Sequence, residues 1–238
     1  MVQFTCMAAN TEAQSNRICF SAVEVAAEAS AGGVLYKGTF IIRRSCMSKK
    51  TYNVGDVGPA GGIVFYKASI ARTAILCNIR WKYLEVAPVE FWQHSYFGYQ
   101  RFGNSFEKNV LVGVTDTKLG SGLSNTFKLV RTFGREAHTT PMSREGWSGA
   151  DYAAAVCGNF YLNGYKDWFL PSLDELKALS QNLKATALFS SPDKVWSWMW
   201  SSSELTPLAA YQVHLASGDS GAFPREDIVG ICPVRMFC

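Results

Sequence analysis

The sequence predicts an α+β fold: a compact domain in which two helices pack on short, mostly antiparallel strands. Two segments, at 150–162 and 172–183, have a helical spacing of apolar residues or a helix-capping sequence. Several short segments with strand character surround them, without the strand–helix–strand repeats of a parallel sheet. Hydrophobic residues make up 48% and charged residues 18% of the 238 residues, so the chain can fill a core.

Composition also excludes several classes of protein. The net charge is only +4 and no segment is dense in Lys and Arg, so nucleic acid is not an expected partner. No window approaches the ~18 apolar residues of a membrane span, so membrane insertion is not expected. The first twenty residues lack the basic start and apolar stretch of a secretory signal.

Seven cysteines occur without a CxxC pair. Their number and spacing leave two interpretations open. They are isolated small hydrophobic residues with one or two exposed thiols, or some of them form a disulfide, such as Cys157 with Cys232.

The first half of the chain gives few strong signals. Residues 1–50 differ from the rest and are predicted to be an N-terminal extension of unassigned role, with a short helix before a strand at 34–42. The main domain is predicted at 51–238. Glycines around Pro59 precede a β-branched segment at 63–66, which predicts a turn followed by a buried strand. Residues 93–147 are rich in Gly, Ser, Thr and Asn, and we expect long loops with short strands there.

The second half begins with the two predicted helices. An alanine-rich helix at 150–162 is expected to end at Asn163-Gly164, where both residues tolerate the left-handed cap conformation. A short strand at 167–170 is then stopped by proline. Ser172 and Glu175 have the S-x-x-E spacing of a capping box, which predicts a helix that buries leucines 176, 179 and 183.

The C-terminal third is predicted to be antiparallel sheet. Residues 210–215 alternate, with Gln212 and His214 on the polar face of the strand. Residues 217–222 have the composition of a turn. Residues 228–237 are expected to return as the partner strand, with Pro233 at an edge or bulge because proline cannot donate to the ladder.

Three tryptophans at a spacing of two, Trp196, Trp198 and Trp200, would share one face of a strand. The first interpretation is that they form a buried wall of the core. The alternative is an exposed platform on which sugars or bases stack.

Catalytic and metal-binding patterns are weak. Residues 218–221 spell GDSG, as around the nucleophile of trypsin-like proteases, and Ala137-His138 is similar to the sequence around their general base. Both predicted helices lie between His138 and Ser220, where that fold needs β-barrel strands, so a hairpin turn explains the string better. The three histidines, His94, His138 and His214, are far apart and no metal-binding motif occurs. We therefore predict no metal and no cofactor.

Six strings are together similar to one family of bacterial surface proteins. They occur in the family's order over about residues 52–238 and are VGDVGPAGGIVFY (54–66), WKYLEVAP (81–88), GSGLSNT (120–126), NGYKDWFLPSLDEL (163–176), WSSSE (200–204) and CPVRMF (232–237). The chain thus resembles the Lcl C-terminal-domain-like family. The resemblance implies a compact domain related to C-type-lectin-like and formylglycine-generating-enzyme-like folds, in which the shared motifs build the core. It also implies that variable loops near the C-terminus bind ligands.

These observations predict a non-enzymatic ligand-binding module, an adhesin or lectin-like protein whose ligand is a glycan or a protein. We expect it on the cell surface, in the periplasm or secreted, with the cytoplasm as the alternative. The candidate ligand-binding residues are polar, lie on the last strands and loops and fall outside the shared motifs; they are Gln212, His214, Ser217, Asp219, Arg225 and Glu226.

Two other functions stay open. One is an enzyme on the same scaffold, a hydrolase or oxidase. The other is a structural homo-oligomer with the tryptophan stripe buried between subunits. Arg235 is expected to satisfy buried carbonyls or to pair with Glu204.

Overall fold

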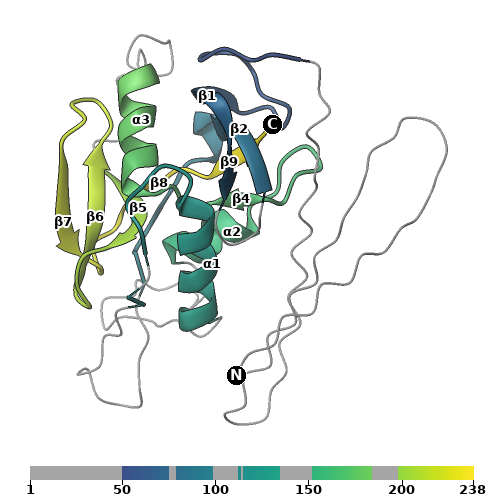
Figure 1. Cartoon of the computed structure of the whole chain (residues 1–238). Helices are drawn as coiled ribbons and strands as arrows, with labels where there is room; N and C mark the ends of the chain where they lie inside the picture. The colour runs from purple at the N-terminus through teal and green to yellow at the C-terminus, as the bar shows by residue number, and fades with distance from the viewer. Residues whose placement is uncertain (1–49, 75–78, 99–111, 114, 135–151, 184–197) are drawn as a thin grey trace, which may run out of the picture. The chain divides into compact units, whose positions relative to one another are not determined.

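A computed structural model describes residues 50–74, 79–98, 112–113, 115–134, 152–183 and 198–238. The described part is a mixed α+β structure with three α-helices and two sheets of mostly antiparallel strands, which confirms the predicted class (Figure 1). The helix and strand predicted within residues 1–49 lie outside the described residues. The predicted division into an extension and a main domain stays a prediction.

The two sheets have different strand orders. In the first sheet every neighbouring pair is antiparallel, in the order β1 (Ile63–Ala74), β2 (Ile79–Val86), β9 (Val234–Phe237), β4 (Trp168–Phe169). In the second sheet only β5 and β8 are parallel, in the order β3 (Gln93–Ser95), β8 (Val229–Ile231), β5 (Trp198–Glu204), β6 (Ala209–His214), β7 (Ser220–Pro224).

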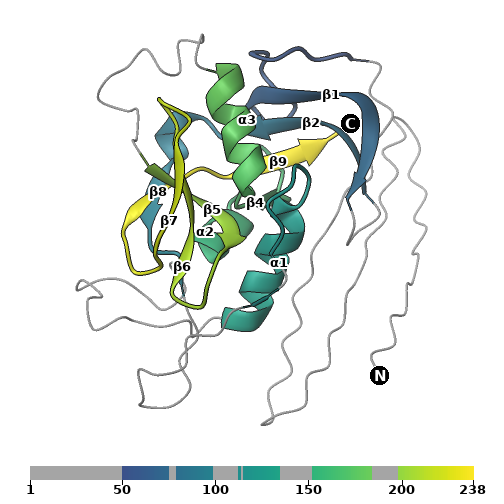
Figure 2. The same ribbon diagram turned by 60° about the vertical axis from the view of Figure 1, so that its left-hand side comes forward.

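Three α-helices and one short 3-10 helix complete the described fold. They are α1 (Gly122–Phe133), α2 (Ala153–Asn159), α3 (Leu173–Leu183) and η1 (Val89–Phe91). Helix α3 lies between the two sheets in both views (Figures 1 and 2). The main hydrophobic cluster accordingly joins this helix to strands of each sheet.

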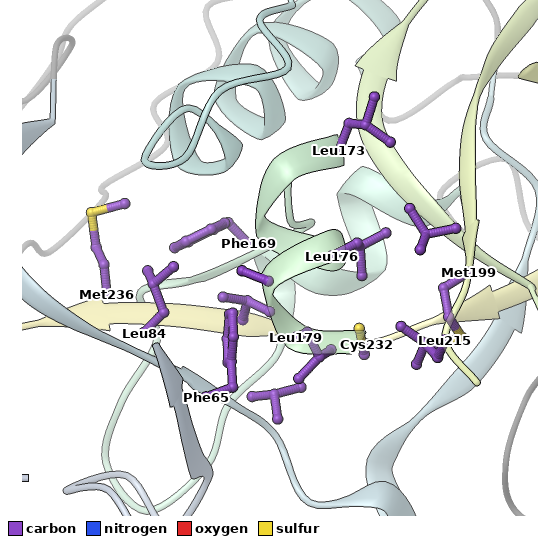
Figure 3. Close-up of a cluster of buried hydrophobic side chains, with 14 of the residues drawn as sticks. Phe65, Leu84, Phe169, Leu173, Leu176, Leu179, Met199, Leu215, Cys232 and Met236 are labelled. Atoms are coloured by element: carbon purple, nitrogen blue, oxygen red, sulfur yellow. The ribbon is translucent and has the colours of Figure 1, made fainter. Parts of the chain in front are cut away.

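That cluster is drawn in Figure 3, where Leu176 and Leu179 of α3 lie between Phe65 of the first sheet and Met199 of the second. All four side chains are fully buried. The predicted burial of these two leucines is confirmed, whereas the side chain of Leu183 is not described.

The capping box at the start of α3 is confirmed. The Ser172 backbone N–H donates to Glu175 Oε2 at 2.7 Å, and the Glu175 N–H donates to Ser172 Oγ at 3.4 Å. The same carboxylate accepts the N–H of Gly120 at 2.9 Å, just before α1 begins. A Cβ on Gly122 would lie 2.2 Å from Glu175 Oε2, so only glycine allows α1 to start this close to the carboxylate. Glu175 thereby ties the starts of two helices together.

Glu175 should make stability depend on pH. Burial raises its pKa to about 7, and the backbone N–H donors only partly oppose the rise. The folded protein then holds this proton more tightly than the unfolded chain does. Protonated Glu175 therefore contributes fully to the free energy of unfolding below about pH 4.5. This contribution decreases as the pH rises to about 7, by at most about 1.4 kcal/mol per pH unit.

Urea unfolding of the wild type and of Glu175→Gln, measured at pH 5, 6, 7 and 8, tests this dependence. We expect the slope of unfolding free energy against pH to be shallower in Glu175→Gln. Asp174→Asn removes the neighbouring, half-buried carboxylate and should keep the wild-type slope. Equal slopes in wild type and Glu175→Gln would contradict the assignment.

The expectation of long loops across 93–147 is wrong at α1. The buried face of this helix carries small and polar residues that are typical of loops, Asn125 and Thr126 among them. Asn125 Nδ2 donates to the Asp116 carbonyl at 2.6 Å, and Thr126 Oγ1 accepts the Leu170 N–H at 2.9 Å. These side chains bond neighbouring segments rather than their own backbone, which makes them compatible with a helix interior.

The single return strand predicted at 228–237 is also wrong. The segment forms two strands in different sheets, β8 in the second and β9 in the first. Pro233 separates them, and its carbonyl accepts the N–H of Ala87 at 2.9 Å. The partner of β6 is instead β7, so the turn predicted at 217–222 gives way to a strand from Ser220 onward. The helix predicted at 150–162 is shorter, at Ala153–Asn159.

Candidate functional site

The six predicted ligand-binding residues lie along the β6–β7 hairpin but divide between its two ends. The hairpin is paired from Val213↔Ser220 near its turn to Ala209↔Pro224 at the far end. At about 3.4 Å per residue these ends are roughly 14 Å apart. His214, Ser217 and Asp219 lie at the turn, whereas Arg225 and Glu226 follow the far end. The structure therefore does not bring all six together around one small ligand.

Hydrogen bonds fix the turn between β6 and β7. His214 Nδ1 accepts the Ser217 backbone N–H at 3.2 Å and lies 3.0 Å from Ser217 Oγ, which in turn accepts the Asp219 N–H at 3.2 Å. Because Nδ1 accepts a backbone N–H, the neutral imidazole carries its proton on Nε2. Ser217 and Asp219 are exposed and His214 is half-buried. The turn thus presents polar groups in a defined arrangement.

Two of the six residues are not exposed polar groups, and this part of the expectation is wrong. Arg225 is only 2% exposed: its Nη2 forms an ion pair with Glu204 and donates to the Thr206 carbonyl at 2.7 Å. Gln212 is only 1% exposed. Alternation along the sequence assigned Gln212 to a polar face, but that face is covered by aromatic side chains.

The predicted pairing of Arg235 with Glu204 is wrong as well, because Glu204 pairs with Arg225. Arg235 Nε donates to Asp167 Oδ1 at 2.6 Å, and Nη1 donates to Glu85 Oε1 at 2.7 Å. Its guanidinium also lies 4.1 Å from the centre of the Tyr165 ring. Burial raises the pKa of Glu85, and the charge of Arg235 opposes that rise. These charges hold the segments at 81–88, 163–176 and 232–237 together inside the fold.

Three rings form a half-buried patch on the second sheet, which we name the ring cluster: Trp198, His214 and Phe223. The Trp198 ring centre lies 5.4 Å from that of His214 and 4.8 Å from that of Phe223. Sequence reasoning missed Phe223, because it placed this residue beyond a turn rather than in a strand. The sequence of β7, SGAFP, has no alternation of apolar and polar residues that could have found it, and the alternation appears only in the burial of the strand.

The tryptophan stripe, Trp196, Trp198 and Trp200, lies partly in the core and partly at the surface. Trp200 is fully buried, and its Nε1 lies within hydrogen-bond distance of the carbonyls of Ser95 (3.1 Å) and Asp227 (3.2 Å). The predicted core wall is confirmed for this residue. Trp198, on the same strand face two residues earlier, is half-buried. Trp196 lies outside the described residues.

Gln212 lies beneath the ring cluster. The strand register places it between Trp200 on β5 and Gly221 on β7. Trp198 and Phe223 come from the strands on either side of β6, so their rings meet across this position. Among the described residues, Gln212 Nε2 is a buried donor with no hydrogen-bond partner.

The structure decides between the two interpretations for two of the cysteines. Cys157 and Cys232 are free and buried, so they are isolated small hydrophobic residues and form no disulfide with each other. Burial raises the pKa of both thiols. Cys238 is disulfide-bonded.

The described residues include no group of three or more His, Cys, Asp or Glu that could hold a metal ion. None of the helices that the structure describes is long and apolar enough to cross a membrane. Ser220 is exposed at the start of β7, and His138 lies outside the described residues, so a catalytic pair of the two stays an open alternative.

Comparison with known proteins finds no family model that matches the chain and no curated protein that is similar to it.

Proposed function

We propose that residues 51–238 form a non-enzymatic ligand-binding module, lectin-like or adhesive, whose ligand is a glycan or a protein. The observation that carries this proposal is the hairpin turn, where His214, Ser217 and Asp219 gather on a fixed backbone. The resemblance to the Lcl C-terminal-domain-like family supports the proposal, and so does the α+β architecture that a C-type-lectin-like fold would have.

The hairpin is anchored in the core, as a recognition loop requires. Val213 and Leu215 are buried in the cluster around α3, and Ser180 Oγ of that helix donates to the Leu215 carbonyl at 2.6 Å. Ser201 Oγ of β5 donates to the Tyr211 carbonyl at 2.8 Å. Because the base of the hairpin is fixed, binding at the turn would require little ordering of the backbone.

The disulfide of Cys238 supports a location in an oxidising compartment. We therefore propose a location on the cell surface, in the periplasm or outside the cell, with the cytoplasm as the alternative.

Removing the polar groups of the turn should weaken binding. We expect the double variant His214→Ala/Asp219→Ala to lose at least tenfold in affinity for a ligand found by screening the full chain on glycan and protein arrays. The loss follows because each of the two polar side chains would make a direct hydrogen bond to the ligand. Affinity can be measured by titration calorimetry.

Glu226→Ala is the matched control. Glu226 is also exposed and polar, but it lies at the far end of the hairpin. It should bind as the wild type does. Wild-type affinity in the double variant would contradict the turn as the site.

A further inference from the structure

We propose that the ring cluster and Gln212 bind the ring of a neutral sugar. The ring would stack on Trp198, and one of its oxygens would accept a hydrogen bond from Gln212 Nε2. This inference rests on the proposed ligand-binding function and narrows the ligand to carbohydrate. It also extends the site from the turn onto the sheet.

The amide of Gln212 provides the first argument. A buried amide N–H without an acceptor destabilises a folded protein, so such groups are rare and need an explanation. Gln212 Nε2 is in this state among the described residues, on a side chain that is 1% exposed. A ligand oxygen at this position would supply the missing acceptor.

A ligand would have to pass the Phe223 ring to reach the side-chain amide of Gln212. Gly221, which faces Gln212 on β7, has no side chain, and a Cβ there would lie 2.9 Å from Phe223 Cε2. The Phe223 ring therefore occupies the space that Gly221 leaves. In this proposal the half-buried Phe223 ring turns aside to admit the sugar, a side-chain rotation that leaves the backbone pairing of the edge strand β7 intact.

The chemistry of these residues favours a neutral sugar over other ligands. The indole of Trp198 and the phenyl ring of Phe223 offer apolar faces, which match the C–H face of a pyranose. The amide of Gln212 and the imidazole of His214 offer uncharged polar groups that match hydroxyls around its rim. Arg225, two residues after Phe223, is buried in its ion pair with Glu204, so an anionic group would gain no counter-charge from this guanidinium.

Two variants test the proposal on the full chain. The wild type is first screened on an array of neutral and acidic oligosaccharides, and the strongest ligand is titrated by calorimetry. We expect Trp198→Ala and Gln212→Leu each to bind it at least tenfold more weakly. Gln212→Leu should also unfold at the same or a higher urea concentration, because it removes an unpaired buried donor at similar volume. Ser220→Ala, an exposed change on the opposite face of β7, should leave affinity unchanged.

Each other outcome overturns the inference. If both variants bind the sugar like the wild type, the ring cluster is not its site, but the proposed function stands. If the chain binds only acidic glycans or proteins, the ligand class of this inference is wrong and the proposed function again stands. If Gln212→Leu is less stable than the wild type, the amide is already paired within the protein. If neither glycan nor protein arrays yield any ligand, the proposed function fails together with the inference.

Discussion

Replacing Arg235 with alanine is expected to lower the unfolding free energy by about 3–5 kcal/mol. Its guanidinium is almost fully buried and neutralises Glu85, which is completely buried, and Asp167. Without Arg235, the Glu85 carboxylate stays in the interior with its charge uncompensated, and the Tyr165 ring loses the cation above it. Urea unfolding at pH 8 measures the loss.

The unfolding free energy that Arg235→Ala loses should be smaller at low pH. Burial already raises the pKa of Glu85, and removing Arg235 removes the main opposing charge, so the variant takes up a proton more readily. At pH 5 part of the destabilisation should therefore be relieved. Lys118→Ala is the control, because Lys118 forms an ion pair with Asp116 at the surface and is 79% exposed. Its loss should stay below about 1 kcal/mol. An Arg235→Ala protein as stable as the wild type would show that the buried pair is not needed.

Replacing Trp200 with alanine is expected to cost a similar amount, about 3–5 kcal/mol. The side chain is fully buried, and its ring meets Phe97 edge-on with the centres 5.5 Å apart. The change leaves a cavity and removes the N–H that lies within hydrogen-bond distance of the carbonyls of Ser95 and Asp227. Thermal and urea unfolding both report the loss.

Trp198→Ala is the matched control, on the same face of the same strand. Because Trp198 is half-buried, its removal should cost clearly less stability than the removal of Trp200. The order of the two losses is the test. If Trp198→Ala were the more destabilising variant, the assignment of one ring to the core and the other to the surface would be reversed.

The candidate site was only partly predictable. Turn composition and alternation were enough to find His214, Ser217 and Asp219, because turn signals depend on residues close together in the chain. Gln212 and Arg225 were expected to be exposed for the same reason, since both are polar residues near loops. Their burial depends on the Phe223 ring, which reaches across from β7, and on Glu204, which lies 21 residues before Arg225.

The fold, like the site, was predictable from the sequence only where the interacting residues are close together in the chain. The sequence by itself determined the features that form between near neighbours: the capping box of Ser172 and Glu175, the helix that follows it and the short strand that stops before Pro171. The pairing of distant segments was settled by three-dimensional packing, which puts β8 and β9 in different sheets and joins Arg235 to Glu85 across 150 positions of the chain. Local signals are read from propensity and hydrogen-bond geometry within one turn. The pairing of distant segments depends instead on whether the complete core pairs its buried charges and packs its aromatic rings. No single segment contains that information.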